Sequence, residues 1–197
     1  MDIVIASKNR HKFDEIVGIF EDTDINLLFA GDYPDLPDVV EDGDTLFENA
    51  LLKAKKIGDT LKMPCIADDT GFYVNSLDGK PGINAAHYAG EHRSYADNNA
   101  KVLSELADAD DKSAYFQTVT VFYDPLTGEI EHSIGTVNGY VIDRCRGDKG
   151  FGYDSIFVPE SYEKTYAEMT DDEKNKMSHR YKSISGLVTA IINRKIL

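Results

Sequence analysis

The stretch Pro64-Cys65-Ile66-Ala67-Asp68-Asp69-Thr70-Gly71 places two acidic residues directly after an apolar run. The apolar run predicts a short buried strand that ends at the two acids. Two like charges side by side repel each other, so the fold gains no stability from placing Asp68 and Asp69 at the end of a strand. A divalent cation such as Mg²⁺, which takes oxygen ligands, would neutralise the pair. Asp, Thr and Gly are also ordinary turn formers, so this stretch alone leaves a metal site and a polar turn equally open.

On both sides of this stretch the hydrophobic pattern alternates between strands and helices, which predicts a mixed α/β fold. Strands are expected over residues 2–6, 25–30, 72–77, 113–123 and 129–142. Helices are expected over residues 10–22, from a cap at Thr45 through Leu61, from Ser94 to about 108, and from about 180 to 194. The last two strands read as a long hairpin. We therefore expect an elongated central sheet that is flanked by helices and bridges two lobes.

Polar caps and apolar stripes support the predicted helices. Thr45 with Glu48, and Thr170 with Glu173, have the spacing of a capping box. The apolar stripe of the first helix, expected to face the core, consists of Phe13, Ile16, Val17 and Phe20.

Size and charge limit the functions that this chain can have. A chain of 197 residues can be one large domain or two small lobes, and we expect a single functional domain over residues 1–197. The content of 42% hydrophobic and 28% charged residues is that of a soluble globular protein. Asp and Glu number 35 against 21 Lys and Arg, and the resulting formal charge of −14 disfavours binding to nucleic acid or acidic membranes. A small anionic ligand remains compatible with this charge, because local cations can outweigh it.

The N-terminus and the cysteines indicate a cellular compartment. Met1-Asp2 leads directly into a strand, without a basic signal segment or a long apolar span, so we expect a cytoplasmic protein. Cys65 and Cys145 lack metal-ligand spacing, and we expect both to be buried free thiols in a reducing compartment.

The segment Ser7-Lys8-Asn9-Arg10-His11-Lys12 lies between the first strand and the first helix. Free backbone N–H groups and the helix dipole favour an anion at this position. Cations are locally unfavourable at a helix N-terminus, so the basic residues of this segment suggest an anionic ligand. The segment matches neither a Walker A loop nor GxGxxG. Taken alone, it favours an ordinary cap formed by Asn9 with solvated basic side chains.

Three further segments carry polar residues that could serve the same site. Glu41 precedes the second predicted helix, where Lys53 lies beside the buried stripe, and Glu41 could complete a carboxylate cluster with the two aspartates. Residues 147–154 place glycines around an aromatic ring, which lets backbone approach a ligand. Residues 173–180 end in two donors that open a helix. By spacing alone, Glu41 and Lys53 could be ordinary surface charges, residues 147–154 a hairpin turn and residues 173–180 a solvated helix cap. Each of these explanations accounts for its segment as well as a binding site does, or better.

Together these segments resemble the inosine/xanthosine triphosphate pyrophosphatases. The resemblance rests on Ser7-Lys-Asn-x-x-Lys12, Glu41-x-Gly-x-Thr-x-x-Glu-Asn-Ala50 with Lys53-Ala54, Ala67-Asp-Asp-Thr-Gly71, Gly79-x-Pro-Gly82, Gly150-Phe-Gly-Tyr-Asp154 and Glu173-Lys-Asn-x-x-Ser-His-Arg180. These six motifs follow the family's order from residue 5 to about 181. The chain departs from the family pattern at Lys8 (usually Gly), Thr70 (often Ser), residues 85–88 (Ala-Ala-His-Tyr for Ser-Ala-Arg-Tyr) and Ser155 (usually Pro).

The resemblance implies an activity and a role for each matched residue. It implies Mg²⁺-dependent hydrolysis of ITP, dITP or XTP to the monophosphate and pyrophosphate, in two lobes with the active-site cleft between them, and a homodimer. Glu41 and Asp69 would hold the metal, and Asp69, with Asp68 shaping the site, would be catalytic. The implied substrate-binding residues are Ser7, Lys8, Asn9, Arg10, His11, Lys12, Lys53, Thr70, Phe151, Gly152, Tyr153, Asp154, Lys174, His179 and Arg180.

Two other classes of protein could use some of these residues. A phosphomonoesterase with an aspartyl nucleophile would use Asp68 or Asp69 but would release orthophosphate. A non-catalytic nucleotide-binding module would keep the phosphate and base motifs without needing Glu41, Lys53 and both aspartates. Their joint presence favours the enzyme.

Overall fold

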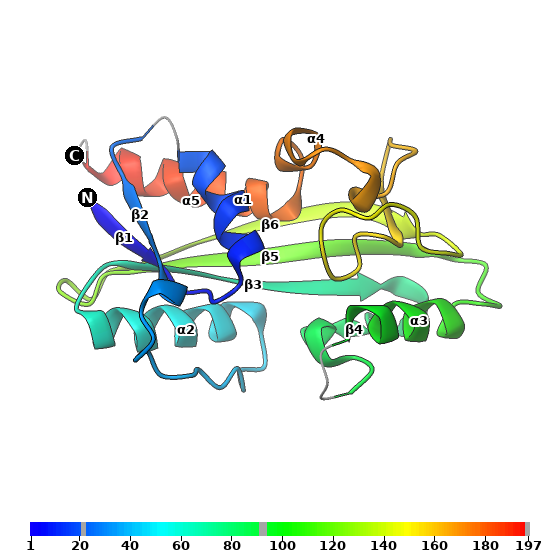
Figure 1. The fold of residues 1–197 in the computed structure, drawn as a ribbon, viewed down its shortest axis with the longest axis horizontal. Coiled ribbons are helices and arrows are strands. Elements are labelled where there is room, and N and C mark those ends of the chain that lie inside the picture. Colours follow the sequence, from blue (N-terminus) through cyan, green and yellow to red (C-terminus); the bar gives the residue numbers. More distant parts are fainter. Residues whose placement is uncertain (21–22, 91–93, 196–197) are drawn as a thin grey trace. The chain divides into compact units, whose positions relative to one another are not determined.

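The computed structural model describes residues 1–20, 23–90 and 94–195, and it has the predicted mixed α/β architecture (Figure 1). The described strands are β1 (Asp2–Ile5), β2 (Asn26–Phe29), β3 (Cys65–Val74), β4 (Pro81–Gly82), β5 (Ser113–Tyr123), β6 (Ile130–Val141) and β7 (Phe157–Pro159). The described helices are α1 (Arg10–Phe20), α2 (Leu46–Leu61), α3 (Tyr95–Glu105), α4 (Asp171–Asn175) and α5 (His179–Lys195). Short 3₁₀ turns are η1 (Ala30–Asp32), η2 (Asn75–Leu77), η3 (Ala85–His87) and η4 (Tyr166–Glu168).

The strands form one mixed sheet. Among the described residues it has seven strands in the order β2-β1-β3-β5-β6-β7, with β4 paired to β3. β1 is parallel to β2 and β3, with Ile5 opposite Phe29 on one side and Ile66 on the other. β4 and β7 run antiparallel to β3 and β6. The parallel strands β1 and β2 are connected through α1, as a crossover requires.

The chain divides into two compact units, and each has its own core. Unit 1 comprises Met1–Asp69, Thr118–Gly135 and Arg180–Leu197. Unit 2 comprises Thr70–Gln117 and Thr136–His179. The division passes through β3 between the second aspartate and Thr70. The single functional domain and the cleft between lobes stay predictions.

In unit 1, helices cover both faces of the strands. Figure 1 shows α1 and α5 on one face and α2 on the other. Ile3 and Ile5 of β1 pack with Ile16 of α1 and Leu187 of α5, and all four side chains are fully buried. Because strands buried on both faces lack alternation, β1 reads as a continuous apolar run. On α5, Ser183 adds a buried hydroxyl that donates to Thr120 Oγ1 at 2.7 Å.

Unit 2 has an aromatic core. The Phe72 ring stacks on Tyr153, with centroids 4.6 Å apart and planes at 20°. Phe116 contacts Phe72 and, on α5, the imidazole of His179, whose ring lies 4.5 Å away at 11°. Such ring pairs stabilise a core beyond the area that they bury.

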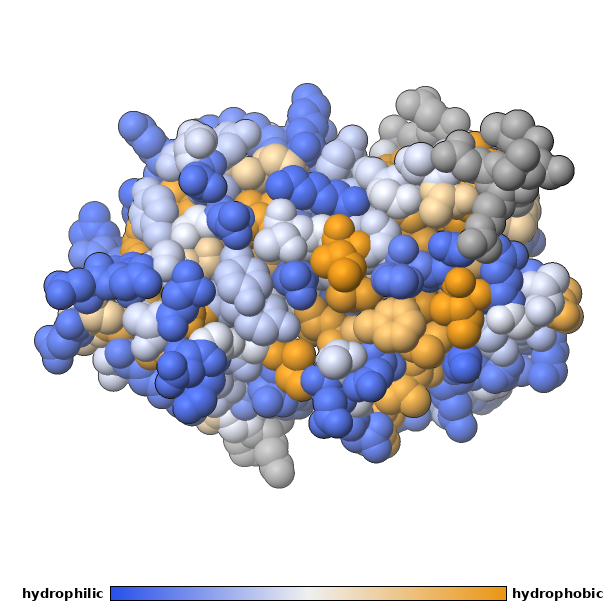
Figure 2. Space-filling model, turned by 180° about the vertical axis from the view of Figure 1, so that it is seen from behind, coloured by the Kyte–Doolittle hydropathy of each residue, from blue (hydrophilic) through white to orange (hydrophobic). Residues whose placement is uncertain are grey.

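The surface is mostly hydrophilic but carries apolar side chains. Figure 2 shows apolar side chains gathered among hydrophilic neighbours on one face. In unit 1, exposed apolar side chains include Leu126 at 75%, Ile134 at 55% and Ile130 at 37%. Contiguous exposed apolar groups often mark interaction surfaces. No helix within the described residues is long and apolar enough to cross a membrane.

The main correction to the predicted fold concerns β3. The predicted strand that ends at the acids, followed by a turn and a strand over 72–77, is wrong. A single strand, Cys65–Val74, runs through Asp68 and Asp69, and η2 follows it. The extended backbone tolerates both acids because cations from three helices neutralise them, as the site geometry shows.

Smaller corrections concern single side chains. Val17 is 36% exposed rather than buried, because the core-facing side of α1 carries Phe13, Ile16 and Phe20. Cys65 is buried and free as expected, whereas Cys145 is exposed. The predicted capping box at Thr45 is half formed.

That half-formed cap has a clear hydrogen-bond pattern. Thr45 Oγ1 accepts from Glu48 N–H, but the Glu48 carboxylate accepts from Asp44 N–H instead of returning to Thr45. At Thr170, by contrast, the capping box is complete, because both reciprocal hydrogen bonds with Glu173 are present. The predicted helix from Ser94 ends at Glu105, short of residue 108, and residues 21–22 of the predicted first helix lie outside the described residues.

Candidate active site

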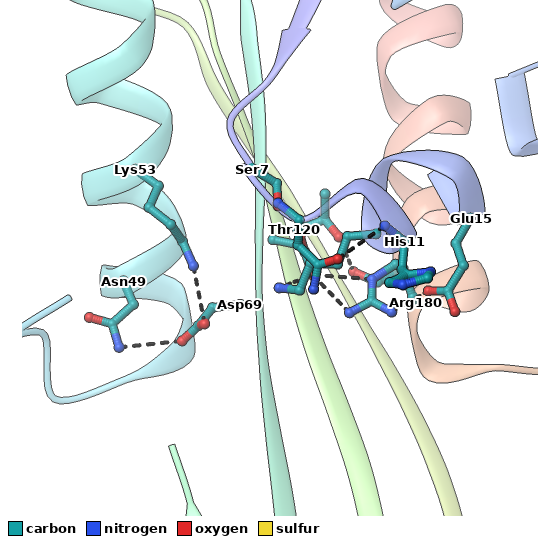
Figure 3. Close-up of polar contacts among 12 residues, drawn as sticks. Ser7, His11, Glu15, Asn49, Lys53, Asp69, Thr120 and Arg180 are labelled. Atoms are coloured by element: carbon teal, nitrogen blue, oxygen red, sulfur yellow. Dashed lines mark hydrogen bonds and ion pairs between the residues drawn. The ribbon is translucent and has the colours of Figure 1, made fainter. Parts of the chain in front are cut away.

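Adjacent residues of a strand point to opposite faces, and this separates the two aspartates. Asp68 meets Lys12 from α1 and Arg180 from α5. Asp69 instead meets Lys53 and Asn49 of α2 (Figure 3). The two carboxylates therefore contact different cations, although the charges of Lys12 and Lys53 each act on both. The repulsion expected from their adjacency in sequence is largely removed by the pleat of β3.

Asp68 is the buried anion of the site. Its side chain is 2% exposed, and its Oδ2 accepts from Lys12 Nζ at 3.1 Å and from Arg180 Nε and Nη2, each at 3.2 Å. Burial raises the pKa of Asp68, but the charges of Lys12 and Arg180 oppose it more strongly and hold the pKa well below its usual range. Asp68 is thus a permanent carboxylate that fixes two cations.

Arg180 also reaches a residue that the sequence patterns did not single out. Its Nη1 donates to Glu15 of α1, so the guanidinium joins Glu15 to Asp68. A signal was present in the sequence: Glu15 lies three residues after Lys12 and therefore on the same side of α1. Nothing in its local pattern distinguishes it from a solvated surface acid.

Asp69 belongs to a second cluster, with α2. Lys53 Nζ lies 2.7 Å from Glu41 Oε2 and 3.2 Å from Asp69 Oδ1, and Asn49 Nδ2 donates to Asp69 Oδ2 at 3.3 Å. Burial raises the pKa of Asp69, the charges of Lys53 and Lys12 oppose this, and the neighbouring Glu41 carboxylate adds to the rise. A raised pKa makes Asp69 the better proton acceptor of the two aspartates.

Asn49 explains how the loop before α2 is held. Asn49 Oδ1 accepts from Gly43 N–H at 2.8 Å while its Nδ2 binds Asp69. One buried amide therefore joins β3 to the loop that carries Glu41. The sequence placed Asn49 on the same side of the helix as Lys53, and the structure brings both to Asp69.

Glu41 and Asp69 can offer oxygen ligands to one cation, because both contact a single ammonium group, Lys53 Nζ. No group of three or more His, Cys, Asp or Glu side chains suited to a metal occurs in the part of the chain that the structure describes. Mg²⁺ is commonly bound through one or two carboxylates together with substrate phosphates and waters. This donor set fits that mode of binding and not an all-protein cage.

The segment 7–12 caps α1. Asn9 Oδ1 accepts from His11 N–H at 3.0 Å, and Ser7 Oγ accepts from Asn9 N–H at 3.1 Å. Lys8 forms an exposed ion pair with Asp38 at 2.7 Å. In this segment, the ordinary capping interpretation of Asn9 is confirmed.

The basic residues of α1 differ in direction. Arg10 pairs with Asp14 at 2.9 Å on the exposed side of α1, and its guanidinium lies 5.2 Å from the Phe13 ring centroid. Lys12 points to the buried Asp68 instead, and burial lowers the pKa of Lys12. Lys12 is thus tied to the carboxylate cluster, whereas Arg10 is held on the exposed side of the helix.

In unit 2, a second group forms around Asp154. Its Oδ2 accepts from Lys174 Nζ at 2.8 Å and from Phe151 N–H at 2.9 Å, and both charged side chains are at most 7% exposed. Lys174 Nζ also lies 5.3 Å from the Phe151 ring centroid. At Gly150 (φ +70°) a Cβ would lie 2.1 Å from Asp154 Oδ2, so glycine is required there. The structure thus brings Phe151, Asp154 and Lys174 together.

Other predicted residues of unit 2 have different surroundings. Tyr153 is buried in the aromatic core, and its hydroxyl donates to Ala85 O at 2.7 Å. His179 is 3% exposed and stacks on Phe116. Thr70 is partly buried within β3, and Gly152 has φ +65°. Tyr153 and His179 are thus packed in the aromatic core of unit 2, whereas Phe151 is only partly buried.

The chain matches the family model described as "Ham1 family" over residues 3–190. It is 38% identical over 196 residues to a dITP/XTP pyrophosphatase of Thermoanaerobacter pseudethanolicus, covering 98% of each chain. It is 40% identical over 190 residues to a dITP/XTP pyrophosphatase of Geobacillus kaustophilus, covering 94% of this chain and 92% of the relative.

The chain is also similar to solved structures of Ham1 proteins. The Ham1 protein of Staphylococcus aureus superposes with a TM-score of 0.87 at 36% identity, over 99% of this chain and 100% of that one. A HAM1 protein from Coxiella burnetii superposes with a TM-score of 0.89 at 33% identity, over 98% of this chain and 99% of that one.

Proposed function

The chain belongs to the Ham1 family, and from this membership we propose that it hydrolyses nonstandard purine nucleoside triphosphates. Its substrates are ITP, dITP and XTP, and its products are the nucleoside monophosphate and pyrophosphate. The observation that carries the proposal is the separation of Asp68 and Asp69 by the pleat of β3. One aspartate fixes cations beside the N-terminus of α1, and the other shares Lys53 with Glu41.

Hydrolysis requires water to attack the α-phosphorus while the bond to the β-phosphate oxygen breaks. Asp69 orients this water and accepts its proton at the carboxylate, for which its raised pKa suits it. The pyrophosphate leaves with the electron pair of the broken bond. Glu41 and Asp69 would hold Mg²⁺, which when bound screens the phosphates and lowers the pKa of bound water.

The triphosphate requires cations that are held in place near its phosphates. Lys12 and Lys53 supply them, and each is fixed by a carboxylate, Asp68 for Lys12 and Glu41 for Lys53. The capping segment at residues 7–9, at the positive end of α1, and Thr70 of β3 add donors. Lys8, Arg10 and His11 belong to the same proposed phosphate-binding segment.

Base recognition is assigned to the turn at residues 151–154, to Lys174 and His179, and, by the resemblance, to Arg180. The Phe151 ring stacks on the base, and Gly152, Tyr153, Asp154, Lys174 and His179 line its surroundings. Hypoxanthine and xanthine present an acceptor at O6 where adenine presents an amino donor. Buried donors that face adenine would lose their partners, at a cost of about 1–3 kcal/mol each, and this excludes ATP.

We also propose that the protein is a cytoplasmic homodimer. Exposed apolar side chains such as Ile134 and Leu126 support association. The negative charge disfavours nucleic acid as a partner.

The test is product analysis with a panel of nucleoside triphosphates and Mg²⁺. We expect ITP, dITP and XTP to give monophosphate and pyrophosphate, with ATP nearly untouched. Orthophosphate as the primary product would indicate a phosphomonoesterase, and binding without turnover would indicate a nucleotide-binding module. ATP turnover as fast as that of ITP would contradict the assignment of substrate.

A further inference from the structure

Helix α3 contacts the turn that carries Phe151, and no motif of the sequence assigned it a role. Asn99 of α3 is 5% exposed, and its Nδ2 donates to Gly152 O and to Ser155 Oγ, each at 3.1 Å. Tyr95, four residues earlier and so on the same side of the helix, has its ring centroid 6.2 Å from that of Phe151. All of these residues belong to unit 2.

The hydrogen bonds on the two sides of Phe151 fix its backbone. On one side, Phe151 N–H donates to Asp154 Oδ2 at 2.9 Å. On the other, the carbonyl of Gly152 accepts from Asn99. The turn contains glycines at φ +70° (Gly150) and φ +65° (Gly152), which have wide conformational freedom. Without both anchors, the direction of the Phe151 ring would be poorly defined.

Fold stability alone gives a poor account of Asn99. Its Oδ1 is buried and has no hydrogen-bond partner among the described residues. Burying an unpaired acceptor is unfavourable, and this offsets part of what the two Nδ2 bonds contribute. The neighbouring Asn98 differs, because its Oδ1 accepts from Ala89 N–H at 2.7 Å while its Nδ2 donates to Ala85 O and Ala86 O.

We propose that Asn99 is a positioning residue for base recognition, acting through the Gly152 carbonyl on the ring of Phe151. The proposal rests on the proposed function, because it takes Phe151 as the ring that stacks on the purine. Ser155, which stands where the family usually has proline, supplies a second anchor for the same amide. Asn99 should therefore govern affinity for the nucleoside part of the ligand and not for the phosphates.

The test measures two ligands separately by titration calorimetry. Inosine monophosphate carries the base, and pyrophosphate carries only phosphates. In Asn99→Ala we expect the Kd of inosine monophosphate to rise about 5- to 20-fold, from the loss of the hydrogen bonds and of ring orientation. The Kd of pyrophosphate should stay within about twofold, and for ITP the KM should rise far more than kcat falls.

Asn98→Ala is the matched control, because it removes a buried amide from the same helix that does not bind the turn at residues 150–155. It should lower the melting temperature but leave the Kd of inosine monophosphate within about twofold. Ser155→Ala removes one of the two Asn99 bonds and should raise that Kd about 2- to 4-fold. If Asn99→Ala does not fold, the Kd of inosine monophosphate for Ser155→Ala tests the proposal instead.

Three results would overturn the inference: an unchanged Kd for inosine monophosphate in Asn99→Ala, an equal rise for pyrophosphate, or an equal rise in Asn98→Ala. If Asn99→Ala does not fold, wild-type affinity in Ser155→Ala has the same force. Product analysis of the wild-type protein distinguishes failure of the inference about Asn99 from failure of the proposed function. Wild-type conversion of ITP to the monophosphate with any of these results leaves the proposed function standing, whereas no conversion overturns both.

Discussion

The same substitution at adjacent positions of β3 should have opposite consequences. Asp68→Asn should strongly destabilise the protein, whereas Asp69→Asn should leave stability almost unchanged and remove most turnover. Both changes keep the size of the side chain and remove one negative charge. The contrast follows from the cations on each face, because Asp68 alone among the described carboxylates contacts both Lys12 and Arg180.

The magnitudes follow from burial. Removing one partner of a buried ion pair costs about 3–5 kcal/mol, because the opposite charge is left uncompensated. Asp68 and Arg180 are each 2% exposed, so Asp68→Asn falls in this range. For a chain of this length, 1 kcal/mol lowers Tm by about 2–4 °C, which predicts a decrease of about 6–20 °C. In Asp69→Asn, Lys53 keeps its contact with Glu41 at 2.7 Å, and we expect a change of about 1 kcal/mol or less.

The assay is thermal unfolding in EDTA, which removes any contribution from bound metal, together with kcat for ITP measured by pyrophosphate release. For Asp69→Asn we expect kcat to fall about 10²- to 10⁴-fold, the usual effect of removing a general base. Asp38→Asn is the control, because it breaks an exposed ion pair with Lys8 and should leave Tm almost unchanged. Equal destabilisation by Asp68→Asn and Asp69→Asn would refute the separation of the two faces. Wild-type turnover in Asp69→Asn would show that Asp68 and Asp69 have a structural role and that Asp69 is not the general base.

Three further predictions follow. His179→Ala and Arg180→Ala should lower kcat/KM for ITP roughly tenfold to a hundredfold and for ATP much less, when Arg180→Ala, which leaves the buried Asp68 unpaired, is assayed below its lowered Tm. Equal losses would assign these residues to phosphates or folding. Burial raises the pKa of the Cys65 thiol to about 12, so a thiol reagent at pH 8 should label exposed Cys145 in the folded protein and Cys65 only after unfolding. Light scattering at micromolar concentration should give about twice the chain mass of 21.9 kDa, and a mass near 21.9 kDa would contradict the homodimer.

Local sequence determined the elements that depend on local physics. The strand predicted over residues 113–123 matches β5, and the hairpin partner differs from β6 by one residue at each end. Ser94 caps α3 by accepting from Asp97 N–H. Turn formers, caps and apolar periodicity act over a few residues, so they can be read from the sequence without knowledge of the tertiary fold.

The course of β3 could not be predicted in this way. Its extended backbone through Asp68 and Asp69 depends on Lys12, which is 56 positions from Asp68, and on Arg180, which is 112 positions away. A local pattern of Asp-Asp-Thr-Gly favours a turn, and only the distant cations shift the balance toward a strand.

Partners with no motif of their own were equally hidden. Glu15 and Asn99 are ordinary polar residues of helices in the sequence, and their roles come from what the folded chain places opposite them. By contrast, the sequence raised Glu41 as a possible member of a carboxylate cluster with the aspartates, although spacing alone favoured surface decoration, and in the structure Glu41 and Asp69 both contact Lys53. Spacing along one helix brings Lys53 and Asn49 to the same side, so that part of the site needed only helical geometry.

The continuity of β3 changes the chemistry that the two aspartates can perform. Had the chain turned after Asp68, both carboxylates could have faced one metal ion, and either could have served as base. Because a strand alternates its side chains, Asp68 is committed to Lys12 and Arg180, and its lowered pKa makes it a poor proton acceptor. Asp69 alone remains beside Glu41, with a raised pKa. The assignment of the base to Asp69, and the opposite outcomes expected for the two Asn variants, rest on this single property of the strand.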